Sequence, residues 1–380
     1  MIRTLEVYSR DPDLVRRGPL PWQTATITLD HLGVSAWQLT MPATARERVA
    51  PGWGVFVTLD RAQILSGSVE DPERVRESNS SLGSMTVSGA DDLAIVASAL
   101  AWPDPTAELA FQGGSDARSG VAETVIKGYV GDNIGTTRAT VRRDPAAPGA
   151  RQVTVAPDLG RGAAVEHSAR YTPLMEVIRA CHGGLGITCQ QSGSEIVFDV
   201  FEPQERPSAV FSHELGNLRS CRWRDALPEV THAIVGGDGE GAARPMQLRA
   251  DSAAAQAWRM AVEEFVDERT ETSTDALDAA GDQALADGRR AGIIEATLAD
   301  TPRLRFGQGY GLGDYVTVSP EPGVAFTDQI TSVVIEADRG RGTLSITPSV
   351  GWVRDGLYTT RQDREISQLR RAVGALQRSL

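Results

Sequence analysis

The sequence contains a single lysine, Lys127, although 38 of its 380 residues are lysine or arginine. A phosphate-binding loop of the Walker type needs a lysine before its Ser or Thr, so the chain has no such loop. Schiff-base chemistry would depend on Lys127 alone. The formal net charge of -12 argues against a protein that binds duplex DNA of any sequence, because that activity needs clustered cations.

Cysteine is also scarce. Cys181, Cys189 and Cys221 cannot form a closed set of disulfides and show no CxxC spacing, which suits a reducing compartment during assembly. The longest apolar run, residues 93–102, is far too short to cross a bilayer. We therefore expect neither a membrane segment nor a signal peptide.

The usual motifs of catalysis and metal binding are missing or incomplete. His213-Glu214 begins like a zinc-protease motif, but the second histidine is absent, so an ordinary polar turn is favoured. Cys181 and His182 with Cys189 form the only Cys/His cluster, yet Cys181 belongs to an apolar helical stripe, which favours packing. No GxSxG sequence occurs, so no serine is a candidate for a nucleophile elbow. We expect no metal and no cofactor.

Two acidic or glycine-rich stretches remain as candidates for a site. Residues 236–241 (GGDGEG) lack the Lys-Ser/Thr of a phosphate loop and the alternating acids of a calcium loop, which favours a flexible connection. The acids among residues 263–271 could supply a pair of carboxylates for glycan hydrolysis. Only Trp258 and Phe265 lie nearby to stack on a sugar, so a solvated charged face is the favoured interpretation.

Strictly alternating segments predict a β-rich N-terminal part. Residues 24–29 place Ala25, Ile27 and Leu29 on one face and three threonines on the other. Further alternating runs are Trp37, Leu39 and Met41; Val55, Val57 and Leu59; and Met85 with Val87. Short strands at this spacing predict a barrel or sandwich. A helix should begin at Leu93, preceded by Asp91-Asp92 and with acid at its first turn, and Pro103 should end it.

The middle of the chain predicts two helices and a hairpin. One helix is expected over residues 121–130 and a second after Thr172-Pro173, where Thr172 would be the cap and Pro173 the first helical residue. The buried stripe of the second helix is Leu174, Val177, Ile178 and Cys181. The hairpin should pair Ile187 and Cys189 with Ile196, Phe198 and Val200, turning at Ser192-Gly193.

After a linker at residues 203–207, residues 210–237 predict the start of a second β-domain. Residues 274–298 predict one long helix, whose alanines suit close packing on a sheet. Gly313-Asp314 then introduces a strand with Val316 and Val318. The last hairpin should join Val333 and Ile335 to Leu344 and Ile346 across residues 339–342.

The order of these segments resembles the tail-hub, or minor tail, proteins of long-tailed phages. The signatures are VFS, LGNL and Trp223 within residues 210–223, the Ala-rich helix, GLGDYVTV at residues 311–318 and the final hairpin. The resemblance covers residues 1–354. It implies a mainly β fold with α insertions (α+β): two small β-barrel-like domains at residues 1–100 and 206–354, a helix and hairpin insert at 101–205, and a C-terminal coiled-coil helix at 355–380.

The C-terminal residues predict a helix that meets a partner chain. Apolar residues alternate at steps of three and four, as in a heptad seam; they are Ile366, Leu369, Val373, Leu376 and Leu380. Two heptads make a short seam, and Gly374 within it costs about 1 kcal/mol. The alternative is that the helix folds back on its own barrel. Ile and Leu at these positions favour dimers, so a threefold seam is implied by the resemblance alone.

The resemblance implies a structural function without enzymatic activity. The protein would form a homotrimeric ring in the virion, at the tail tip, after assembly in the host cytoplasm. Its partners would be the distal tail protein, the tape-measure protein and fibre or spike proteins, with DNA only as transiting cargo that an acidic lumen would repel. Two alternatives stay open: a glycan-binding or glycan-hydrolysing tail-tip module, and the hub of a contractile injection system.

Overall fold

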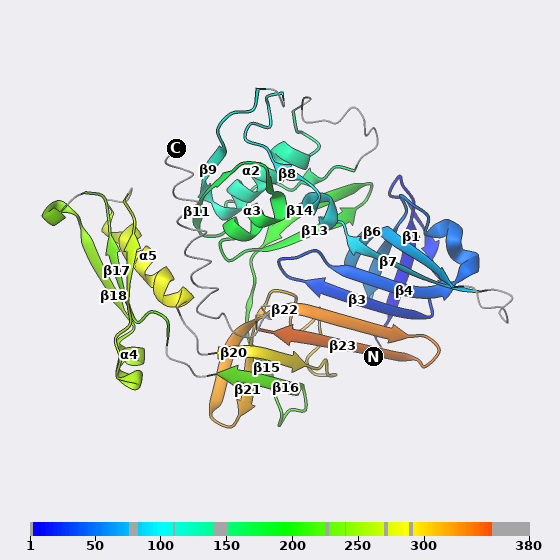
Figure 1. Ribbon diagram of the computed structural model, residues 1–380. Helices are drawn as coiled ribbons and strands as arrows, with labels where there is room; N and C mark the ends of the chain where they lie inside the picture. The colour runs from blue at the N-terminus through cyan, green and yellow to red at the C-terminus, as the bar shows by residue number, and fades with distance from the viewer. Residues whose placement is uncertain are drawn as a thin grey trace.

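A computed structural model shows a mainly β protein with few helices (Figure 1). The structure describes residues 3–75, 83–108, 111–139, 141, 151–224, 228–239, 241–269, 273–288 and 292–351. None of the described helices combines the length and hydropathy that crossing a bilayer requires. The mainly β fold class with α insertions is confirmed.

The N-terminal part is a run of antiparallel strands in the order β3-β4-β7-β6-β5-β1-β2. Their bounds are β1 Leu5–Arg10, β2 Arg16–Pro19, β3 Thr24–Asp30, β4 Ala36–Pro42, β5 Gly54–Leu59, β6 Ala62–Val75 and β7 Ser84–Asp91, with a 3-10 helix at Ala43–Arg48. The alternating runs form strands as predicted, since Ile27, Trp37 and Leu39 are buried while their threonine and glutamine neighbours face outward.

The C-terminal strands continue this same sheet. They are β15 Glu205–Ser212, β16 Leu218–Arg224, β20 Gly292–Leu298, β21 Tyr315–Glu321, β22 Val324–Asp338 and β23 Thr343–Val350. The long strand β22 pairs with β23 along one edge and with β3 along the other, so that Ile335 lies opposite both Ile27 and Ile346. In Figure 1, β22 and β23 lie directly against β3 and β4.

This continuity differs from two barrels with separate cores. Buried apolar residues from both sheet regions form one cluster, in which Ile27, Val316 and Ile335 are fully buried. Within the described strands the ladder does not close on itself, because β2 and β16 are its open ends. The physical reason is that both edges of β22 are paired, one with β3 from the N-terminal part and the other with β23. The division at residues 100, 205 and 354 remains a prediction.

The insert has its own apolar core, above the sheet in Figure 1. Its elements are α1 Leu93–Ala97, β8 Leu100–Ala101, β9 Asp116–Val121, α2 Ala122–Ile134, β10 Thr154–Val155, β11 Ala164–Ala169, β12 Thr172–Pro173, α3 Leu174–Cys181, β13 Gly186–Ser192 and β14 Glu195–Phe201. The predicted hairpin is confirmed, with Cys189 opposite Phe198 and Ile187 opposite Val200. Helix α2 extends four residues beyond the predicted end.

Three local predictions about helix starts and the linker are wrong. Pro173, with an extended backbone, holds the cap position of α3, and Thr172 lies in the short strand before it. The first turn of α1 contains no acid, because Asp92 sits at the cap position without bonding the helix. Strand β15 already begins at Glu205, inside the expected linker.

A third, small lobe stands at the left of Figure 1. It contains a three-stranded sheet in the order β18-β17-β19, with β17 His232–Gly236, β18 Met246–Ala250 and β19 Glu263–Asp267, together with a 3-10 turn at Gly241–Ala243, α4 Ser252–Trp258 and α5 Thr274–Asp287. Helix α5 packs on one face of this sheet, against β17 and β18.

The single long helix predicted at residues 274–298 is wrong in its second half. Helix α5 ends at Asp287, and Gly292–Leu298 is strand β20, which pairs with β16. At Gly288 an added Cβ would lie 2.9 Å from Val230, so the chain needs a glycine there to pass beside β17. The β-branched Ile293 and Ile294 that follow favour a strand.

Candidate functional site

The five residues predicted as an oligomer interface lie outside the described residues. They are Ile366, Leu369, Val373, Leu376 and Leu380. The heptad seam therefore stays a prediction. We searched the described residues for other candidate sites.

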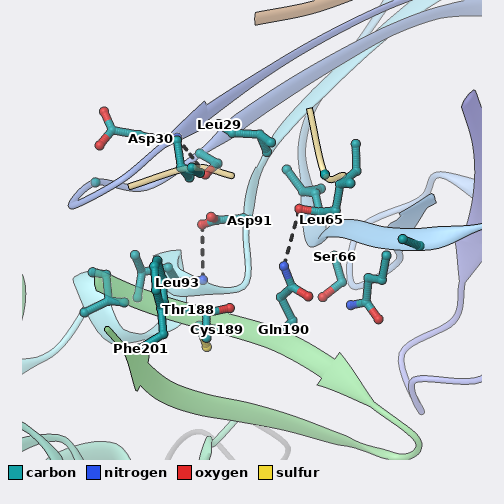
Figure 2. Close-up of a pocket in the computed structure, with 18 of the residues that line it drawn as sticks. Leu29, Asp30, Leu65, Ser66, Asp91, Leu93, Thr188, Cys189, Gln190 and Phe201 are labelled. Carbon is teal, nitrogen blue, oxygen red and sulfur yellow. Dashed lines mark hydrogen bonds between the residues drawn. The ribbon is translucent and has the colours of Figure 1, made fainter. Parts of the chain in front are cut away.

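A crevice of about 350 Å³ lies where the sheet meets the insert (Figure 2). It is bounded by the turn after β3, strand β6, strand β13 and the loop at residues 306–312. Its walls are mostly apolar, with Leu65, Ile187 and Phe201 among them. Gln190 crosses it, and its amide nitrogen donates to the carbonyl of Ile64 at 3.3 Å. The hydrogen bond from Gln190 on β13 to Ile64 on β6 thus bridges the crevice between the insert and the main sheet.

Two carboxylates line this crevice, and burial disfavours the charge of both. Burial raises the pKa of Asp91 to about 7, against hydrogen bonds from Ser35, and it also raises the pKa of Asp30. The Asp91 carboxylate accepts from the backbone nitrogen of Leu93 at 3.2 Å. In Figure 2 the Asp30 side chain points away from Asp91, so the two do not form the facing pair that acid–base hydrolysis needs.

A histidine is packed into the same junction. His31 is almost fully buried between two glycines, because a Cβ on Gly186 or Gly313 would come within 2.7 Å of its ring. Its Nε2 lies 3.1 Å from the amide nitrogen of Gln329, and its ring meets Phe201 edge-on. Burial lowers the pKa of His31 to about 4, so the ring is neutral at pH 7. The neutral ring therefore packs in the junction between the main sheet and the insert.

A fully buried ion pair also ties the sheet to the insert. Arg10 on β1 forms a two-pronged pair with Asp92, and one of the bonds, from Nη1 to Oδ2, measures 2.6 Å. Ser66 donates to the same oxygen at 2.6 Å and accepts from the backbone nitrogen of Gln191 at 2.7 Å. The network thus runs from β1 through β6 to β13. Asp92, which the sequence predicted to stabilise the start of a helix, instead neutralises Arg10, 82 residues away in sequence.

The only lysine belongs to a second charged network, inside the insert. Lys127 Nζ lies 2.6 Å from Glu123 Oε1 and 2.7 Å from Asp199 Oδ1, and it donates to the carbonyl of Pro157. Arg161 adds two further side-chain bonds to Glu123, which lower the pKa of that carboxyl. Every donor of this lysine is occupied, which suits a brace for the 157–161 loop rather than a Schiff base. The sequence could have indicated the pair of Glu123 and Lys127, because residues four apart on a helix lie on the same face.

The cysteine and histidine candidates are parts of the core or of turns. Burial raises the pKa of Cys181 to about 11 and that of Cys189 well above its ordinary value, whereas metal ligation requires the thiolate. His213 lies in the exposed turn after β15. Among the described residues, no group of three or more His, Cys, Asp and Glu side chains is arranged to hold a metal ion.

The acids proposed for glycan hydrolysis lie along an exposed strand. Glu263 and Asp267 are the two ends of β19, and Asp267 is paired with Arg244 and Arg269. Trp258 is also half-exposed, at the end of α4. These side chains spread over a face instead of converging in the crevice of Figure 2, which contains none of them.

Comparison with protein families matches residues 4–351 to the siphovirus ReqiPepy6 Gp37-like proteins. The chain belongs to this family. The resemblance to tail proteins of long-tailed phages is therefore confirmed. A search of curated proteins found no significant match.

Comparison with solved structures shows that this chain has the fold of known phage tail proteins. The 43 kDa tail protein of prophage MuSo2 from Shewanella oneidensis matches with a TM-score of 0.54 and 16% identity, over 92% of this chain and 98% of that one. A tail protein from Neisseria meningitidis MC58 gives 0.53 and 12%, over 92% and 97%. Prophage tail protein gp18 from Listeria monocytogenes EGD-e gives 0.53 and 10%, over 97% and 99%.

Proposed function

We propose that this protein is the structural hub at the tip of a phage tail, where three copies form a ring. The observation that carries the proposal is that the fold matches phage tail proteins over nearly the whole length of both chains. A match of this extent leaves no sizeable described region for a separate enzymatic module. A structural role without catalysis is the simplest function for such a chain.

The construction of the body supports a role in bearing load. One sheet runs through the N-terminal and C-terminal strands, and the buried Arg10–Asp92 pair fastens the insert to it. A rigid unit of this kind suits a ring that joins the distal tail protein and the tape-measure protein to fibres or spikes. DNA would pass through the ring as cargo. The C-terminal helices would meet on the axis through the seam from Ile366 to Leu380.

The experiment is a light-scattering mass of the full chain and of a version truncated before Asp363. A trimer that weakens on truncation is the expected result, because the heptad seam would be lost. A full-length trimer that keeps its affinity without the seam removes the axial helices from the proposal. A monomer in both cases, well above micromolar concentration, contradicts the ring.

The two alternatives draw less support. A glycan hydrolase needs facing carboxylates, and the exposed spread of Glu263 and Asp267 does not provide them. The hub of a contractile injection system would share the fold and differ in its partners. Tail particles carrying this protein at the tip without a contractile sheath, seen by electron microscopy, decide between the two kinds of tail.

A further inference from the structure

Most of the net negative charge of the chain is concentrated in the small lobe of β17, β18, β19 and α5. We call residues 228–288 the acidic lobe. It holds thirteen acidic residues and four arginines, which accounts for nine of the twelve net negative charges of the whole chain. The remaining residues are therefore close to neutral, and the lobe is an acidic appendage.

One face of the acidic lobe's sheet is not covered by α5 and exposes large apolar side chains, with the guanidinium of Arg244 stacked over Phe265 at its border. Helix α5 covers the other face, where Ala233, Val235 and Leu277 are fully buried. The strand register places Leu248 and Phe265 on either side of Ile234, on the face away from Ala233 and Val235. Leu248 is 61% and Phe265 52% exposed. We call this surface the bare face.

The bare face is exceptional for this protein. Among the described residues, eleven large apolar side chains are exposed. Five of them belong to this lobe, within one stretch of twenty residues: Met246, Leu248, Trp258, Met260 and Phe265. Exposed apolar patches of this kind mark interaction surfaces. On the edge strand β19, Glu263 points to the bare face beside Phe265, whereas the next residue, Glu264, points to the side of α5. Both acids are exposed, and neither has an ion-pair partner in the described structure.

The same chain carries a surface of opposite charge. A crevice of about 380 Å³ is lined by Arg3, Arg219 and Arg305, with Leu344 and Ile346 as apolar walls. Arg3 is held by Asp60 and Asp300. Within the described part of the chain, Arg219 and Arg305 have no acidic partner. We call this surface the arginine crevice.

The two surfaces lie in different parts of the molecule. In Figure 1 the acidic lobe stands at the left, whereas the turn between β22 and β23, which borders the arginine crevice through Gly342, lies at the right. Within one copy the two surfaces are therefore apart. Two copies can bring them together head to tail, and a contact between two different surfaces is the kind that closes into a ring.

We propose that the bare face of the acidic lobe of one copy docks on the arginine crevice of the next copy. Glu263 would meet Arg219 and Arg305 at the rim, and Glu264, next to it on the outer edge strand, would add negative charge there, while the apolar side chains of both surfaces pack at the centre. Charge complementarity between the two surfaces is the argument for a second copy as the occupant. This inference rests on the proposed ring and names the surfaces that build it.

The test uses charge reversal in the full-length chain and a light-scattering mass across a dilution series. E263R/E264R and R219E/R305E should each weaken self-association by on the order of tenfold or more, because each places like charges opposite one another. The four changes together should restore association to nearly the wild-type level, since every contact again joins opposite charges. E47R/E195R is the matched control: it changes the charge as much as E263R/E264R, at exposed acids outside both surfaces, and should leave the mass unchanged.

The outcomes separate this inference from the proposed function. A wild-type trimer that both reversed variants leave intact overturns the docking surfaces, keeps the ring, and assigns the bare face to a different protein. Weakening by both variants without rescue by the combination also overturns the pairing. A monomeric wild-type chain overturns the ring and the docking together. Unchanged circular dichroism and melting temperature in each variant show that the comparison concerns association alone.

Discussion

The main sheet with its insert, here called the body, and the acidic lobe differ in how they bury apolar side chains and pair charges. The body buries whole rows of apolar side chains in two cores and pairs its buried charges, as Arg10 does with Asp92. The acidic lobe buries little beyond Ala233, Val235 and Leu277, and it exposes both its acids and its largest apolar residues. This difference is the one expected if the lobe completes its packing against a second copy, as proposed above.

The largest effect on the body should come from Asp92→Ala. Removing this carboxylate leaves Arg10 buried and unpaired, which costs about 3–5 kcal/mol. Urea unfolding measures the loss in the free energy of unfolding. Asp238→Ala, at an exposed position of the acidic lobe, is the control and should change stability by less than about 0.5 kcal/mol. Equal effects would erase the contrast between the two regions.

Ile335→Ala tests whether the body unfolds as one unit. The fully buried Ile335 lies on β22 between Ile27 and Ile346, so its truncation should cost about 2–5 kcal/mol. Hydrogen exchange should then show that β3 and β23 lose protection together, because both pair with β22. Loss of protection in β23 alone would favour two independently stable domains at the predicted boundaries.

Glu123→Gln weakens the second charged network and should cost about 1–3 kcal/mol at pH 7. Its bonds to Arg161 and Lys127 lower the pKa of the folded carboxyl, so its contribution is present above the ordinary value near 4.5 and is lost as the pH falls through the folded pKa. The variant should therefore lose less stability than the wild type on acidification below about pH 4.5. Parallel acid unfolding curves for the two proteins would contradict this role.

Asp91→Asn should have a smaller effect, of opposite sign. The folded pKa near 7 exceeds the ordinary value of 3.8, so the native state holds a proton between these values and loses stability as the pH rises through that window. Asparagine removes this loss and should stabilise the protein by about 1 kcal/mol at pH 8, with almost no change near pH 4. Melting temperatures at the two pH values measure the difference, and a stabilisation that does not depend on pH would contradict it.

The smallest stability effect is expected in the acidic lobe. Leu248→Ser removes a side chain that is 61% exposed and should change the free energy of unfolding by less than about 0.5 kcal/mol. It should nonetheless weaken self-association, which light scattering measures. Leu159→Ser, at a leucine that is 68% exposed in the insert, is the control and should change neither quantity. A large loss of stability would mean that the bare face belongs to the lobe's own core.

The local features of this fold followed directly from the sequence. Residues 24–29 alternate with period two, so their strand and its buried face were predictable. The hairpin of β13 and β14 and the turn between β22 and β23 depend on neighbouring residues, and both were found. The resemblance to phage tail proteins was also visible, because it rests on the order of such local segments.

The pairings that give the molecule its architecture join residues far apart in sequence. Nothing near Thr24–Asp30 indicates that its partner is the end of β22, and nothing near Asp92 indicates Arg10. The strand at Gly292–Leu298 follows an alanine-rich helix, and the edge that β16 offers, far away in sequence, decides where it pairs. The arginine crevice likewise gathers Arg3, Arg219 and Arg305 from three distant segments.

Hydrophobic period and turn chemistry are properties of neighbouring residues, so the sequence alone determined the elements. Strand partners, buried ion pairs and composite surfaces depend on which distant groups the packed chain brings together, so only the tertiary structure decided them.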